Sequence, residues 1–157
     1  MRRLFTLFIL LSLCLFSCAR GEQIPPRAIL DRILSASPAG CGIIRDSSLP
    51  EGDPERLDPL LFRALYARAD GSDDLEDVSA AALFLGSSAS VHREIAVFAC
   101  RGRESAREVA SLCRDRAELI RQTLGSDPMV LVYRSTVVLL ALPDPAPTVA
   151  LLDRLLG

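Results

Sequence analysis

His92–Cys100, with the sequence HREIAVFAC, predicts a β-strand that is apolar on both of its faces. Val78–Leu85 predicts a second apolar strand, and the small residues of Gly86–Val91 predict the turn between the two. Strands without a polar face must be covered on both sides. We therefore expect either helices on both faces of the sheet, or helices on one face and a partner protein on the other.

The chain after this first strand pair predicts a helix, a second hairpin and a final helix. Apolar residues recur at helical spacing through Glu104–Leu124, which is the clearest helical pattern in the chain. Met129–Tyr133 and Thr136–Leu142 are apolar strands on either side of Arg134-Ser135. Thr148–Leu156 predicts a short helix after a proline-rich break.

Two helices are predicted before the first strand pair. Arg27–Ser35 carries one apolar stripe, and a second helix begins near Pro54 with Asp53 as its N-cap. Gly42-Ile43-Ile44 is a candidate for a short edge strand. The predicted fold class is therefore α+β, with an antiparallel sheet of two hairpins and helices packed on it. Its order is helix-helix-strand-strand-helix-strand-strand-helix, within one domain over residues 27–157.

The N-terminus, Met1–Cys18, has the sequence MRRLFTLFILLSLCLFSC and the layout of a secretory signal peptide. Two arginines precede an apolar run, Leu4–Phe16, which is interrupted only by Thr6 and Ser12. Thirteen residues form roughly 20 Å of helix, whereas the hydrocarbon core of a bilayer is about 30 Å thick. The run is therefore too short for a permanent membrane span, although an uncleaved signal anchor remains an alternative.

The end of this segment, Leu15-Phe16-Ser17-Cys18, resembles the lipobox of bacterial lipoproteins. The small Ser17 lets the peptidase approach the bond before Cys18, and the thiol of Cys18 is the predicted lipid attachment site. Cys14 is a poor rival because Leu13 precedes it. We expect residues 1–17 to be removed and residues 18–26 to form a tether that is lipidated at Cys18. Two or three acyl chains on Cys18 would bind a membrane stably. Cleavage after Ala19, with release of the domain, is the alternative.

The composition excludes some classes of partner. The chain has 18 basic residues, all of them arginine, and 20 acidic residues, and the predicted cleavage removes only Arg2 and Arg3 from this balance. A mildly acidic domain lacks the basic face that nucleic acids require, so we expect no nucleic acid partner. The acidic cluster Asp73, Asp74, Glu76 and Asp77 lacks the spacing of a calcium hand and predicts a solvated turn.

Chemically reactive side chains are few. Cys41, Cys100 and Cys113 follow the lipobox, and they are either partners in a disulfide or buried small hydrophobic residues. His92 is the only histidine, and it would need a nucleophile and an acid close by to act as a base. A metal site built from these four residues lacks a Cys-x-x-Cys pair. Glu94 beside Arg93 predicts a salt-bridged strand edge.

The chain resembles the small bacterial envelope lipoproteins known as domain of unknown function 4358. The similarity covers most of Pro25–Leu156, but the turn Arg134-Ser135 stands where that family usually has a glycine. The resemblance implies a lipoprotein address and a fold, but no activity. The matching features are the lipobox at Cys18, the helix end Leu65-Tyr66, the segment Arg93–Phe98 after its small-residue turn, Arg114-Asp115-Arg116 and the apolar last hairpin.

These observations together predict a noncatalytic envelope module without a cofactor. It would be anchored on the extracytoplasmic face of the cell membrane through lipid on Cys18, and it would contact another envelope protein. One alternative is a thiol-dependent enzyme that uses His92 with a cysteine. Another is a ligand-binding accessory of a transporter, which would need a polar-lined cleft.

Overall fold

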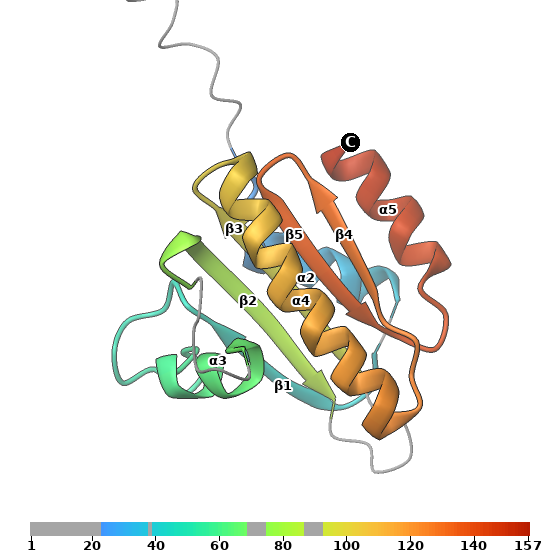
Figure 1. Ribbon diagram of the computed structural model, residues 1–157, viewed down its shortest axis with the longest axis horizontal. Coiled ribbons are helices and arrows are strands. Elements are labelled where there is room, and N and C mark those ends of the chain that lie inside the picture. The colour runs from blue at the N-terminus through green and yellow to red at the C-terminus, as the bar shows by residue number, and fades with distance from the viewer. Residues whose placement is uncertain (1–22, 38, 69–74, 87–92) are drawn as a thin grey trace, which may run out of the picture.

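Five antiparallel strands form one sheet in the order β1-β2-β3-β5-β4 (Figure 1). The computed structural model describes residues 23–37, 39–68, 75–86 and 93–157. The two predicted hairpins, β2–β3 and β4–β5, are both present, and they are joined side by side through β3 and β5. The strands are β1 (Gly42–Asp46), β2 (Val78–Gly86), β3 (Glu94–Cys100), β4 (Met129–Tyr133) and β5 (Thr136–Ala141).

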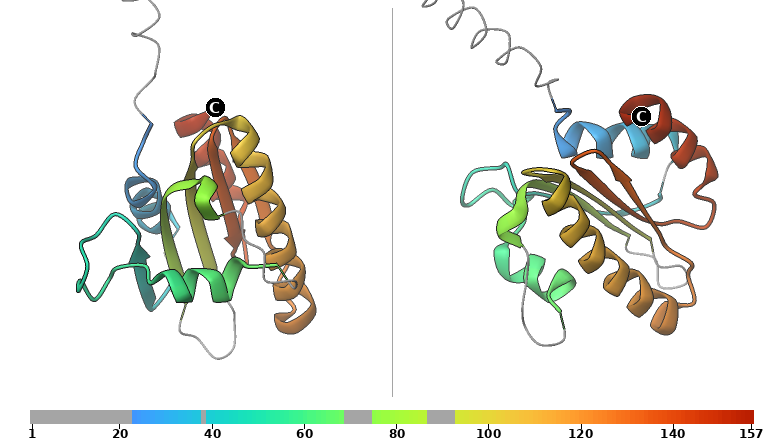
Figure 2. Two further views of the ribbon diagram at one scale, coloured as in Figure 1. Left: turned by 60° about the vertical axis from the view of Figure 1, so that its left-hand side comes forward. Right: turned by 45° about the horizontal axis from the view of Figure 1, so that its top comes forward.

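Helices cover both faces of this sheet (Figure 2), as the first of the two expected arrangements requires. The helices α3 and α4 pack on one face, whereas α2 and α5 pack on the other. No helix among the described residues combines the length and hydropathy needed to cross a membrane. The bounds are α2 (Pro26–Ala36), α3 (Pro59–Tyr66), α4 (Arg103–Leu124) and α5 (Ala146–Leu156), with a short 3-10 helix, η1 (Leu75–Asp77), before β2.

The predicted element order is wrong in one respect, because the sheet has five strands and not four. The additional strand is β1, between α2 and α3, and it pairs with β2 along its whole length. Gly42 is needed where β1 approaches β2, because a Cβ atom there would lie 2.6 Å from the carbonyl oxygen of Leu85. The candidate edge strand at Gly42-Ile43-Ile44 is therefore real, and it continues to Asp46.

The second helix also begins later than the sequence predicts. The helix α3 begins at Pro59, and Asp58 caps it by accepting a hydrogen bond from the backbone N–H of Leu60 at 2.6 Å. Asp53, the predicted cap, accepts a hydrogen bond from the N–H of Glu55 instead. That contact closes a local turn in the loop before α3.

Several predictions concern residues outside the described ranges. They include the signal segment 1–17, the lipid site Cys18, the small-residue turn before β3 with His92, and the first two acids of the cluster, Asp73 and Asp74. Of the other two acids, Asp77 lies at the end of η1, where its carboxylate accepts a hydrogen bond from the hydroxyl of Ser105 at 3.0 Å.

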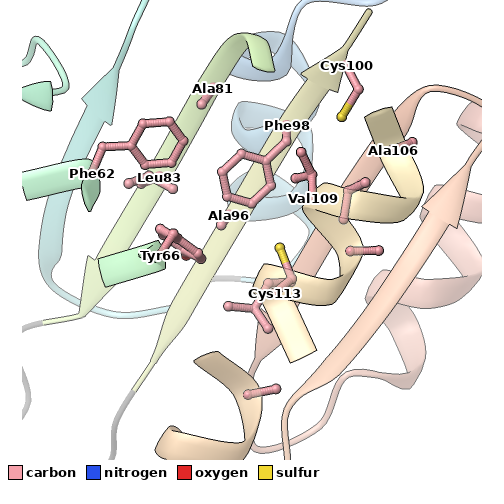
Figure 3. Close-up of a cluster of buried hydrophobic side chains, with 14 of the residues drawn as sticks. Phe62, Tyr66, Ala81, Leu83, Ala96, Phe98, Cys100, Ala106, Val109 and Cys113 are labelled. Carbon is pink, nitrogen blue, oxygen red and sulfur yellow. The ribbon is translucent and has the colours of Figure 1, made fainter. Parts of the chain in front are cut away.

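The core between the sheet and α3 and α4 is centred on three aromatic rings (Figure 3). The rings of Phe62 and Phe98 stack with their centroids 5.7 Å apart. The ring of Tyr66 meets Phe98 edge-on at 5.1 Å. Phe98 thus holds α3 against the central strand, since it contacts both aromatic residues of that helix.

We expect replacement of Phe98 by alanine to lower the free energy of unfolding by about 3–5 kcal/mol, because a cavity would form beneath α3. Urea denaturation measures this loss. Leu60→Ala is the matched control, since Leu60 lies on α3, the helix above Phe98, but its side chain is 75% exposed. If Phe98→Ala cost no more than Leu60→Ala, this description of the core would be wrong.

Candidate functional site

Glu94 is the only acidic side chain among the described residues that is fully buried, with no exposed surface. It is the first residue of β3, and it shares a face of that strand with Ala96 and Phe98. The central position of β3 between β2 and β5 keeps water away from both sides. A carboxylate at such a place is stable only if other groups compensate its charge.

Arg116 and Tyr66 provide this compensation. The guanidinium of Arg116, in the middle of α4, donates to both carboxylate oxygens of Glu94, with Nη2 2.7 Å from Oε2 and Nε 3.3 Å from Oε1. The hydroxyl of Tyr66, at the end of α3, donates to Oε1 at 2.6 Å. One buried carboxylate therefore links the central strand to both helices on this face.

The electrostatics fix the protonation states of these partners. Burial, followed by the charge of Glu94, raises the pKa of Tyr66 well above its ordinary value, so the phenol keeps its proton and acts as a donor. Burial alone would lower the pKa of Arg116, but the hydrogen bonds and charge of Glu94 outweigh this effect and raise it. Glu94 and Arg116 thus form an ion pair without net charge, and the neutral hydroxyl of Tyr66 donates a further hydrogen bond to it.

Such an arrangement is suited to positioning helices and poorly suited to proton transfer. A general acid or base needs a pKa close to the working pH and access to a substrate. Tyr66 is 3% exposed, and the side chain of Arg116 is only 14% exposed. We therefore interpret Glu94, Arg116 and Tyr66 as a structural cluster that sets the positions of α3 and α4 on the sheet.

The predicted salt-bridged edge at Arg93 and Glu94 is wrong, because Glu94 belongs to a central strand of the sheet and forms an ion pair with Arg116 of α4. Neighbouring residues of a strand point to opposite faces, so Arg93 is directed toward the side of α2. There its guanidinium donates to the backbone carbonyl of Ala39 at 2.6 Å.

The cysteines that the sequence singled out do not form an activated thiol site within the described part of the chain. Cys100 and Cys113 are buried free thiols in the core beneath α4, as one of the two sequence interpretations predicts. Burial raises the pKa of Cys100 to about 12, and it raises the pKa of Cys113 still further. Both thiols are therefore protonated at neutral pH and poor nucleophiles. Cys41 lies on the surface, away from this core.

Metal binding finds no support among the residues that can be described. No group of three or more histidine, cysteine, aspartate or glutamate side chains comes together in residues 23–37, 39–68, 75–86 and 93–157. Cys100 and Cys113 share one core, whereas Cys41 is exposed at the start of β1. His92, the fourth proposed ligand, lies outside the described residues.

Hollows on the described surface lie at the opposite ends of β4. A hollow of 440 Å³ adjoins Met129 at the start of β4 and Pro143 and Pro145 before α5. Another of 180 Å³ adjoins Tyr133 at the end of β4 and Leu155 and Leu156 at the end of α5. A third, of 320 Å³, lies next to the start of α3.

We expect Glu94→Ala to lower the free energy of unfolding by about 3–5 kcal/mol, because it leaves Arg116 as an uncompensated and largely buried charge. Arg116→Met should have a similar effect through the unpaired Glu94. The double variant Glu94→Leu with Arg116→Met removes both charges and should lose less than either single variant. Chemical denaturation of the three variants tests this order, and additive losses would contradict the assignment.

We also expect the thiols of Cys100 and Cys113 to resist a thiol-specific reagent in the folded protein at pH 8, because their raised pKa values keep them protonated. Both should react once the protein is unfolded in urea. Mass spectrometry of the labelled peptides measures each site, with the exposed Cys41 as the internal comparison. Rapid labelling of Cys100 or Cys113 in the native state would contradict this expectation.

Comparisons with known proteins give no identification: no family model, curated protein or solved structure matches the chain significantly. The resemblance to domain of unknown function 4358 therefore stays a prediction from the residues quoted above.

Proposed function

We propose that the chain is a bacterial lipoprotein without catalytic activity that serves as a protein-interaction module of the cell envelope. Lipid on Cys18 would hold it on the extracytoplasmic face of the cell membrane. The lipobox-like Leu15–Cys18 after a short apolar segment supports the anchor. The resemblance to domain of unknown function 4358 favours the same location.

The observation that carries the noncatalytic assignment is the state of the reactive side chains. Cys100 and Cys113 are buried and protonated, and Glu94 is neutralised by Arg116. An enzyme that uses a thiol needs a thiolate with access to its substrate. We therefore favour the interaction module over the thiol-dependent enzyme, because the thiols of Cys100 and Cys113 lack both properties.

Chain geometry limits how the domain would sit on the membrane. Gln23 donates a side-chain hydrogen bond to the hydroxyl of Ser135 at 3.2 Å, so the chain enters the domain beside the β4–β5 turn. Gln23 is the fifth residue after Cys18, so the chain between their Cα atoms spans at most about 18 Å when fully extended. A lipid on Cys18 would therefore keep this turn close to the bilayer surface.

We expect mass spectrometry of the mature protein from its native membrane to find an N-terminus at Cys18 with diacylglyceryl mass. Cys18→Ser should leave an unacylated protein that still carries residues 1–17, because the serine hydroxyl cannot take the thioether-linked lipid. Cys14→Ser is the matched control, and it should be processed like the wild type. A mature N-terminus elsewhere, or acylation that persists in Cys18→Ser, would refute the anchor.

A further inference from the structure

The two edges of the sheet are protected to different degrees. Along β1, the loop before α3 bonds to the outer edge, since the N–H of Asp46 donates to Glu55 at 2.9 Å and the N–H of Leu57 donates to Asp46 at 3.0 Å. Arg45 and Asp46 also place charges on this strand. Such features prevent another strand from pairing with a sheet edge.

At the opposite edge, β4 has the sequence MVLVY, with neither a charge nor a proline (Figure 1). Tyr133 pairs with Thr136 across a two-residue turn, so these two residues exchange backbone hydrogen bonds. Because the pattern alternates, Leu131 also bonds to β5, whereas the backbone groups of Val130 and Val132 point outward. Within the described part of the chain, no backbone group outside the sheet bonds to them.

The surface around β4 also favours binding of an extended peptide segment. Val132 is 43% exposed and Met129 is 38% exposed, on opposite faces of the strand. The hollows of 180 and 440 Å³ lie at the two ends of β4, and each is bordered by β4 and by residues of α5 or of the segment just before it. A peptide strand paired with β4 would therefore find room for apolar side chains at both ends.

An exposed positive charge marks the end of this strand. Arg134 follows β4, whereas Asp127, which precedes β4, is already paired with Arg121 of α4 at 3.1 Å. Arg134 takes a φ of 54°, in the left-handed region where glycine is usual.

We propose that the outer edge of β4 binds an extended peptide of a partner protein as a sixth strand of the sheet. The segment has apolar side chains at alternate positions and an acidic residue opposite Arg134. The backbone of the peptide forms hydrogen bonds with the outward N–H and C=O groups of Val130 and Val132. This inference deepens the proposed interaction role by naming the surface and the partner's chemistry. It does not require the lipid on Cys18, so the two proposals can fail separately.

The test uses the full chain in detergent and the synthetic peptide acetyl-Glu-Val-Thr-Val-Thr-Val-Arg-amide, with a fully N-methylated version as its control. We expect the first peptide to bind and the second not to bind, because N-methylation removes the backbone donors. Amide hydrogen exchange by NMR should slow at Val130 and Val132 but change little at Leu131, whose N–H already bonds to β5. Absence of binding, or binding without this alternating protection, would overturn the proposal.

Two variants distinguish the contribution of the Val132 backbone N–H to binding from that of its side chain. Val132→Pro removes one outward N–H but no hydrogen bond to β5, so the fold should persist while binding weakens about tenfold or more. Val132→Ala keeps the N–H, and it should bind within a few-fold of the wild type. Circular dichroism checks that both variants are folded. Equal affinities of a folded Val132→Pro variant and the wild type would exclude pairing at this edge.

A charge exchange tests the orientation. Arg134→Glu should weaken binding of the peptide with the terminal glutamate, and it should have a smaller effect on a peptide with glutamine there. Equal losses for the two peptides would show that Arg134 does not face the acidic residue. Sedimentation of the protein without peptide tests whether a second copy of this chain occupies the edge instead. A dimer that Val132→Pro dissociates would overturn the proposal of a separate partner protein.

Discussion

Burial of one negative charge at the centre of the sheet constrains the arrangement of the elements on the α4 side. The two faces of β3 are both covered, so Glu94 has no route to water. Its charge must be compensated from the helices, and Arg116 and Tyr66 do this from two different helices. A shift of either helix along the sheet would break these contacts, at the cost of an unpaired buried group. The cluster therefore specifies helix position, whereas the aromatic contacts of Phe98 supply packing.

Much of the fold could be predicted from local sequence pattern. The apolar segments Val78–Leu85 and His92–Cys100 predict strands covered on both faces, and the structure confirms this cover for their described residues. The strand β1 was harder to recognise, because a five-residue segment between glycines and prolines has a weak pattern of its own. Its pairing with β2 bridges more than 30 residues, and local propensity carries no information about such distant contacts.

The buried cluster of Glu94, Arg116 and Tyr66 can be predicted from the sequence only in part. Alternation along the strand places Glu94 on the same face as Ala96 and Phe98, and helical phase places Arg116 beside the apolar stripe that contains Cys113. These two signals are compatible with a buried acid and a basic partner, but the adjacent Arg93 favours a salt-bridged strand edge instead. They do not reveal that the two meet, because this depends on how α4 crosses the sheet. The chemistry of the cysteines depends in the same way on burial, which spacing alone does not give.

The two proposals, although tested separately, agree in their geometry. The contact between Gln23 and Ser135 ties the start of the domain to the turn at the Arg134 end of β4. A lipid on Cys18 would hold that end close to the bilayer, because the intervening chain is short. A segment paired with β4 would then have its acidic end near the membrane. If both proposals hold, the partner best suited to this edge would itself be attached to the membrane, with an extended segment close to its own anchor.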